Sequence, residues 1–421
     1  ITFNGATNGY CIDISGSNRE WGRITAKGNS MDCTPVQVTG SGNKFACVSS
    51  SDVTATAAGN FSFSGVRVVG DNNKFDRIFA DSLVNDGHSN ASFPQAILFQ
   101  GTGNTFGTVD VRSGQSGVVL GSLSGTTRGV IINAFDMVDN GIYQLGGHLE
   151  LATLSYQGDE EPCVFIGSAS IDTINLYGSC HGVGIQSPER VRIGTINLQP
   201  DASGNSPLFA FRTRPTSSAD GELFIGAIVG EFEGTSLFEV ASGNPLGYLS
   251  IGTMEVTFIY DAAVATSITG WADMRGCGGF NIGQGRVQVV DKNSVVTSAA
   301  PFQMQAPSPC ARQSFWHNFE VVVVLPDKTT VVASAFRGVN FAQQAIFVTG
   351  AKWRTDIGPY IEGTSVGGPS DDSANQAPVG GTWIRGKRLL HSFPAASGVE
   401  GWVCVTAGTP GTWKTFGSIS A

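Results

Sequence analysis

A six-residue phrase, Gly-x-x-Asn-x-Phe, occurs three times near the start of the chain at a nearly constant spacing. Its copies begin at Gly40, Gly70 and Gly101, so each step is about thirty residues long. A fixed period in this range is typical of stacked structural repeats. Gly and Asn tolerate the left-handed backbone of a sharp corner, and the Phe is expected to open a short strand. The phrase therefore predicts a β-solenoid in which the chain climbs one rung per repeat.

A second phrase, apolar–small–Thr–apolar, extends the repeat through the middle of the chain. It occurs at 106–109, 151–154, 171–174, 193–196 and 251–254, with a looser copy at 225–228 and a weak one from Ile282. The copies from 151 to 196 follow one another at about twenty residues, which indicates bare rungs. Longer steps indicate inserted loops, which solenoids often place on the binding face. Short period-two segments such as 66–69 and 96–99 predict strands that pair with the rungs above and below, about 4.8 Å away.

The composition agrees with an all-β chain. Charged residues make up 14% of the 421 residues, which is too few for long helices with solvated faces. The apolar content of 41% is ample for a core. So low a charge content also favours a surface that is partly covered by another subunit.

Several classes of function are disfavoured. A net charge of −9 without a Lys/Arg run argues against nucleic-acid binding, and no apolar stretch is long enough for a membrane span. The eight cysteines include no C-x-x-C pair and the histidines are scattered, so neither a metal site nor a cofactor is predicted. We expect most cysteines to be free, buried core residues.

Three passages carry a resemblance to a known family. They are 140–143 followed by 158–165, then 352–360, and the C-terminal run 401–414, which is the most specific. On these passages the chain resembles the tailspike proteins of bacteriophages that infect encapsulated Gram-negative bacteria, most closely those of Acinetobacter phages.

The resemblance implies an all-β fold, a right-handed single-stranded parallel β-helix of the pectate-lyase-like kind, assembled as a homotrimer. With the repeats, it leads us to expect a β-helix over 1–360 and a small β-rich region over 361–421. It also implies an N-terminal virion-anchoring part absent from this chain, attachment to the phage tail or baseplate, and a location on the virion. The implied partner is bacterial capsular polysaccharide, which such proteins bind and depolymerise.

The implied chemistry directs attention to paired carboxylates. Hydrolysis of a glycosidic bond uses one protonated and one ionised carboxyl group, about 5 Å apart in retaining enzymes and about 6.5–9.5 Å apart in inverting ones. Aligning 140–143 with 161–164 places Asp139 under Glu160 on the next rung. The catalytic candidates along this edge are Glu160, Asp139, Asp136 and Glu161, with Asp159 and Asp201 beside them. Each could instead cap a corner through its own backbone.

Other side chains in these rungs could contact a sugar. The substrate-binding candidates are Tyr156, Asp159, His181, Arg212, Arg214 and Tyr177. The tyrosines could equally be core residues, the histidine structural, and the arginines parts of a solvated loop. If the first edge is not the site, Asp220, Glu222, Glu231 and Glu233 could face a partner subunit in a groove.

The sequence therefore favours a capsule-degrading endoglycosidase, a glycoside hydrolase on a tailspike. Two alternatives stay open. One is a polysaccharide lyase that eliminates at a uronic acid on the same fold, and the other is a spike or adhesin that binds without catalysis. The sequence leaves open the sugar repeat, the linkage, and whether the site lies within one subunit or between subunits.

Overall fold

The computed structural model describes residues 9–28, 33–55, 64–85, 95–113, 116–121, 124–138, 140–158, 163–165, 167–185, 190–208, 210–213, 221–233, 237–240, 246–260, 266–273, 277–291, 296–303, 314–317, 319–324, 332–333, 336–337, 346–349, 352–355, 361–362, 372–374, 377, 385–391, 395–408 and 411–420. These residues form strands, turns and connections, and they contain no helix. The predicted all-β class is therefore confirmed.

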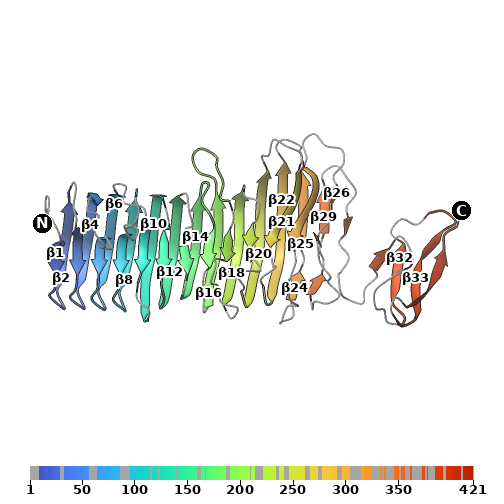
Figure 1. The fold of residues 1–421 in the computed structure, drawn as a ribbon, viewed down its shortest axis with the longest axis horizontal. Helices are drawn as coiled ribbons and strands as arrows, with labels where there is room; N and C mark the ends of the chain where they lie inside the picture. Colours follow the sequence, from blue (N-terminus) through green and yellow to red (C-terminus); the bar gives the residue numbers. More distant parts are fainter. Residues whose placement is uncertain are drawn as a thin grey trace.

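Two long sheets run side by side along the molecule (Figure 1). The first has fourteen strands: β1 (Gly9–Ile14), β3 (Cys33–Val38), β5 (Ser64–Val68), β7 (Gln95–Phe99), β9 (Ser116–Leu120), β11 (Ile142–Gln144), β13 (Cys163–Phe165), β15 (Val183–Ile185), β17 (Phe211–Thr213), β19 (Phe238–Glu239), β21 (Thr266–Asp273), β23 (Val296–Gln303), β26 (Val332–Ala333) and β27 (Phe336–Arg337).

The second has sixteen strands: β2 (Glu20–Lys27), β4 (Lys44–Ala55), β6 (Lys74–Asn85), β8 (Thr105–Arg112), β10 (Thr126–Met137), β12 (His148–Gly158), β14 (Ser168–Tyr177), β16 (Arg190–Gln199), β18 (Glu222–Phe232), β20 (Tyr248–Tyr260), β22 (Phe280–Asp291), β24 (Ser314–His317), β25 (Phe319–Val324), β28 (Ile346–Thr349), β29 (Lys352–Thr355) and β30 (Ile361–Glu362).

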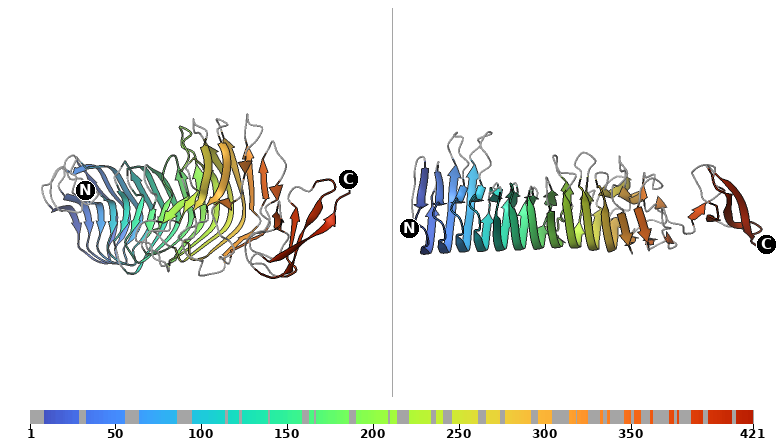
Figure 2. Two further views of the ribbon diagram at one scale, coloured as in Figure 1. Left: turned by 45° about the vertical axis from the view of Figure 1, so that its right-hand side comes forward. Right: turned by 90° about the horizontal axis from the view of Figure 1, so that it is seen from below.

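From β1 to β23 the chain alternates between the two sheets, so each of these rungs contributes one strand to each sheet. Neighbouring strands pair in parallel, for example β12 with β14 and β14 with β16; the β29–β30 pair is antiparallel. The rungs are stacked along the long axis in all three views (Figure 2). This arrangement confirms the predicted parallel solenoid. A smaller sheet follows, made of β31 (Asp372–Ala374), β32 (Arg388–His391), β33 (Val399–Thr406) and β34 (Thr412–Ser418).

The first repeated phrase is in register between rungs, as its period predicts. Phe45 pairs with Phe75, and Phe75 with Phe106. The Phe45 and Phe75 rings stack in the core with their centroids 4.9 Å apart and their planes 7° from parallel. Stacking of identical side chains one rung apart gives each rung the same internal shape as its neighbour, so the repeat propagates.

The recurring Asn of the phrase has a different role from the one predicted. The Asn43 backbone N–H donates to Asn73 Oδ1 at 2.9 Å, and the Asn73 N–H donates to Asn104 Oδ1 at 2.9 Å. All three side chains are fully buried. They form an asparagine ladder that links successive corners, because a buried backbone N–H needs an acceptor.

The residue with a left-handed backbone conformation is the one that directly precedes each ladder asparagine. Gly42 has a φ of 71°, Asn72 of 55° and Gly103 of 68°. The first Gly of the phrase is required for space instead, since a Cβ on Gly70 would lie 2.1 Å from the Gly40 carbonyl oxygen. The prediction that Gly and Asn make the corner is thus correct, but the assignment of positions within it is corrected.

The second phrase marks a bend in the strands of the sixteen-stranded sheet. In β14, Ile171 and Ile174 are both buried, while Asp172 and Thr173 between them face outward. In the next rung Gly194 occupies the place of Asp172, and a Cβ there would lie 2.4 Å from the Asp172 carbonyl oxygen. The small residue therefore permits close approach of rungs at the bend.

The bend divides the outer surface of this sheet into two parts. We call the outward residues before it the first face: Arg128, His148, Glu150, Ser168, Ser170, Arg190, Arg192, Glu222, Phe224, Tyr248 and Ser250. The outward residues after it form the second face: Asp110, Asn133, Phe135, Thr153, Ser155, Gln157, Thr173, Asn175, Tyr177, Thr195, Asn197, Gln199, Val229, Glu231, Thr253 and Glu255.

The described cysteine side chains are free thiols. Cys163, Cys180, Cys277 and Cys404 are buried and Cys47 is half-buried. Burial raises the pKa of Cys180 to about 12, so its thiol stays neutral near pH 7. For these five residues the prediction of free core thiols is confirmed.

Candidate functional site

Half of the residues predicted for the site lie outside the described residues. They are Asp139, Asp159, Glu160, Glu161 and Arg214, and Asp220 of the alternative groove lies outside them too. The strand register used to group the acidic candidates is confirmed for the described strands. Ile142 pairs with Cys163, as the alignment of 140–143 with 161–164 predicts. The described ends of β10, β12, β14 and β16 lie on successive rungs, and we use the term predicted edge for these strand ends.

The described candidates lie in four different places. Tyr156 points into the core and has no exposed surface, so the prediction that it stacks on a sugar is corrected. Asp136 is exposed at the end of β10, with a φ of 56° beside a register shift. Tyr177 is half-buried on the second face, and His181 is half-buried just beyond the end of β14. Arg212 lies on the other sheet, between Gly184 and Glu239 in the neighbouring rungs.

Asp201 caps a corner of the chain, which is the structural alternative that the sequence left open for each acidic candidate. Its side chain accepts hydrogen bonds from the Asn205 side chain at 3.0 Å and from the backbone N–H groups of Ser203 and Asn205. The Asn205 hydrogen bonds hold the pKa of Asp201 below its usual value. The carboxylate closes the turn that follows β16.

A row of amide and hydroxyl side chains runs along the second face. Asn197 Nδ2 donates to Asn175 Oδ1 at 2.8 Å, and Asn175 Nδ2 donates to Ser155 Oγ at 3.3 Å. Ser155 pairs in register with Asn133, whose amide donates to Asp110 Oδ1 at 2.8 Å. The row is half-buried and spans five consecutive rungs from β8 to β16.

A second row of larger side chains lies beside it, near the predicted edge. Phe135, Gln157, Tyr177 and Gln199 occupy this row on successive rungs, from β10 to β16. The Phe135 and Tyr177 ring centroids are 6.3 Å apart with planes inclined by 50°. The second face therefore combines aromatic surface with uncharged hydrogen-bonding groups that repeat at the rung spacing of about 4.8 Å.

Two carboxylates belong to the continuation of these rows. Glu231 is half-buried on β18 and Glu255 is exposed on β20. Because Val229 pairs with Glu255 and Glu231 with Thr257, the two glutamates are diagonal neighbours on adjacent rungs. The rung spacing and the rise along a strand put their Cα atoms about 8 Å apart. Glu255 was not among the residues predicted from the sequence, although the copies of the second phrase at 225–228 and 251–254 give the same register.

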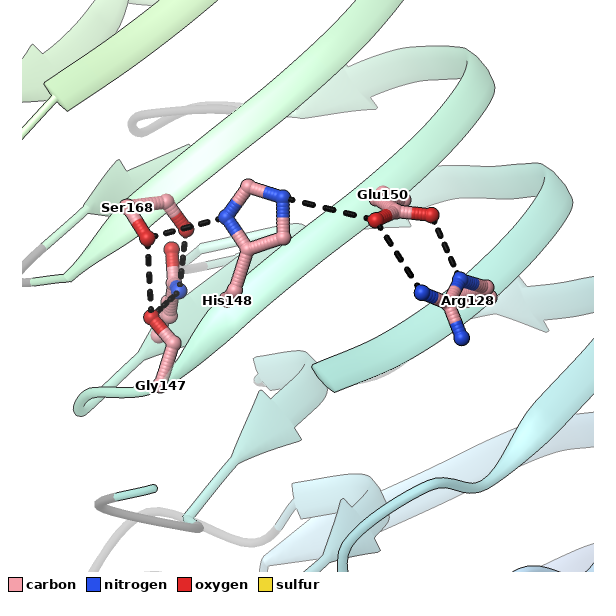
Figure 3. Close-up of polar contacts among 6 residues, drawn as sticks. Arg128, Gly147, His148, Glu150 and Ser168 are labelled. Carbon is pink, nitrogen blue, oxygen red and sulfur yellow. Dashed lines mark hydrogen bonds and ion pairs between the residues drawn. The ribbon is translucent and has the colours of Figure 1, made fainter. Parts of the chain in front are cut away.

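The first face carries a polar network that crosses three rungs (Figure 3). His148 Nδ1 and Ser168 Oγ are 2.9 Å apart, and His148 Nε2 lies 3.7 Å from Glu150 Oε1. Arg128 Nε donates to Glu150 Oε2 at 2.6 Å. This hydrogen bond lowers the pKa of Glu150, so the carboxylate is ionised and already paired at neutral pH. Such a group is suited to orienting its neighbours rather than to donating a proton.

Two general properties follow from the described part of the chain. No three His, Cys, Asp or Glu side chains in it form a group that could bind a metal ion. The same part contains no helix long and apolar enough to cross a membrane.

No family model matches the chain, no curated protein matches it, and no solved structure matches it.

Proposed function

We propose that this chain is the β-helix of a tailspike-like protein that binds a bacterial capsular polysaccharide along the second face and cleaves it by hydrolysis. The observation that carries the proposal is the second face itself. Its amide and hydroxyl side chains recur on successive rungs, with the aromatic rings of Phe135 and Tyr177 beside them and a diagonal pair of carboxylates next to them.

A repeating polymer of sugars is a suitable ligand for such a surface. Sugar hydroxyl groups both donate and accept hydrogen bonds, as do the amides of Asn133, Asn175 and Asn197. The ring of Tyr177 offers an apolar surface with a polar end, which suits the mixed character of a pyranose ring. The uncharged side chains in the middle of the row favour hydroxyl groups over phosphate there.

The proposed chemistry is hydrolysis with inversion. A Cα separation of about 8 Å between Glu231 and Glu255 is compatible with the roughly 6.5–9.5 Å between carboxyl groups that leaves room for a water molecule. One carboxyl group would protonate the leaving oxygen while the other activates the water. A pair formed by Asp139 and Glu160, one rung apart, would instead suit the shorter separation of a retaining enzyme.

The assembly belongs to the same proposal. A homotrimer of right-handed parallel β-helices on the virion, bound through a separate N-terminal part, would present several copies of the face to the capsule. Trimers would also need three chains to separate before unfolding, which favours kinetic stability.

The test is incubation of the protein with a panel of purified capsular polysaccharides. New reducing ends support the hydrolase, whereas a new ultraviolet absorbance from an unsaturated uronic acid would mean a lyase. Retention of a polysaccharide without either product would mean a receptor-binding spike, and no retention of any member would contradict the proposal.

Variants locate the chemistry within the protein. Glu231→Gln and Glu255→Gln should each reduce cleavage at least about a hundredfold while leaving binding intact, because an amide keeps the shape but loses both proton-transfer roles. Glu20→Gln is the matched control, since Glu20 pairs with Lys44 on an exposed surface at the first rungs. Loss of cleavage in Glu160→Gln or Asp139→Asn instead would move the reaction to the adjoining edge.

A further inference from the structure

The first face has one arginine more than its glutamates can neutralise. Arg128 pairs with Glu150 at 2.6 Å, and Arg190 pairs with Glu222 at 2.6 Å. Arg192 is exposed, and no carboxylate of the described residues lies within ion-pair distance of it. Arg192 is thus the surplus cation of a surface that is otherwise charge-paired.

The guanidinium of Arg192 is nevertheless oriented by its surroundings. Its Cζ atom lies 5.8 Å from the centroid of the Phe224 ring, which is the paired position on the next rung. The Cζ atom of Arg190 lies 5.7 Å from the same centroid. Contact with an aromatic face restrains a guanidinium while its N–H groups remain able to donate to a ligand.

An aromatic surface continues beyond Phe224. The Tyr248 ring centroid is 6.0 Å from that of Phe224, with the planes inclined by 51°. Both side chains are half-buried, and Tyr248 pairs in register with Glu222. Ser170 and Ser250 flank Arg192 and Phe224 in the same row and add hydroxyl groups at the two ends.

We propose that Arg192, Phe224 and Tyr248 form a second sugar-binding site, separate from the second face, for a sugar unit that carries a carboxylate. A guanidinium matches the planar carboxylate with two parallel hydrogen bonds. The apolar face of the sugar ring then lies against the Tyr248 ring and the outer edge of Phe224. The class of ligand is therefore a uronic acid or another acidic sugar. This inference rests on the proposed function in taking a polysaccharide as the ligand.

The experiment compares each acidic polymer with its neutral counterpart. Polygalacturonate, polyglucuronate and alginate are tested beside the same polymers after chemical reduction of their carboxyl groups, by affinity electrophoresis of the full chain. We expect at least one acidic polymer to bind about tenfold or more tightly than its reduced form, since hydrogen bonds to charged groups contribute more than neutral ones.

Two of the three variants, Arg192→Gln and Arg128→Gln, remove the same single positive charge, and the third removes only the aromatic ring. Arg192→Gln should lose the preference for the acidic polymer, and Phe224→Ala should weaken it because the guanidinium loses its support. Arg128→Gln removes one positive charge from the same row but a charge that is already paired, so the preference should remain. Circular dichroism establishes that all three variants keep the β-fold.

The outcomes separate this inference from the proposed function. Equal binding of acidic and reduced polymers, or an unchanged preference in Arg192→Gln, would overturn the acidic-sugar site. Cleavage of a capsule that persists in Arg192→Gln with a raised KM would support it alongside the hydrolase. Preference for acidic polymers without cleavage of any capsule would support this site and contradict the proposed function.

Discussion

The asparagine ladder should contribute measurably to stability, and Asn104 is its most informative position. Asn104 Oδ1 accepts the Asn73 N–H at 2.9 Å, and Asn104 Nδ2 donates to the Gly70 carbonyl at 3.1 Å. Asn104→Ala leaves a buried N–H and a buried C=O without these partners. At about 1–3 kcal/mol for each unsatisfied group, the variant should lose about 2–6 kcal/mol.

The assay is the rate of unfolding at a fixed guanidinium concentration, followed by circular dichroism. If a loss of about 3 kcal/mol in the free energy of unfolding acts entirely on the unfolding rate, unfolding becomes about a hundredfold faster. Asn72→Gly is the matched control. Asn72 is an exposed corner residue with a φ of 55°, where Gly stands in both neighbouring rungs, so the change should stay within about 1 kcal/mol. Unfolding of Asn104→Ala at the wild-type rate would refute the role of the ladder.

Three further predictions concern local chemistry. Gly70→Ala should lower the free energy of unfolding by about 3 kcal/mol or more, or prevent folding, because the new Cβ would overlap the Gly40 carbonyl. Gly22→Ala is the control and should fold normally, because a Cβ there meets nothing within 4 Å. Soluble yield and Tm distinguish the two variants. Cys180 should resist iodoacetamide in the native protein at pH 8 and react once the chain is unfolded, by mass spectrometry; ordinary reactivity in the native state would contradict its burial and raised pKa. The lowered pKa of Glu150 means that the native state holds this proton less tightly, so its contribution to stability is present above about pH 4.5 and is lost as the pH falls through the lowered value. The stability difference between wild type and Glu150→Gln should therefore shrink on acidification, and a difference independent of pH would argue against the pairing with Arg128.

Much of the fold follows from the sequence because a solenoid repeats its contacts. The spacing of Phe45, Phe75 and Phe106 and of the apolar–small–Thr–apolar phrase predicted the strand register found in the structure. The roles within each phrase were harder to predict. Whether a Gly serves a positive φ, as at Gly42, or close approach of two rungs, as at Gly70, depends on the neighbouring rung rather than on local sequence.

The candidate site was less predictable for a related reason. Tyr156 and Tyr177 lie at the ends of adjacent strands, but the alternation of each strand turns the first inward and the second outward. The bend shifts that alternation, so a count of residues from the nearest turn gives the wrong face. The proximity of Glu231 and Glu255 becomes visible only when β18 is aligned with β20, with Val229 opposite Glu255.

The most direct test of the proposed mechanism is a structure of the Glu231→Gln variant with a fragment of the capsular polysaccharide that the wild-type protein cleaves. We expect sugar rings along the second face, one of them against Tyr177, with a glycosidic oxygen between positions 231 and 255. A fragment bound only on the outer side of the fourteen-stranded sheet, with the second face empty, would contradict the mechanism.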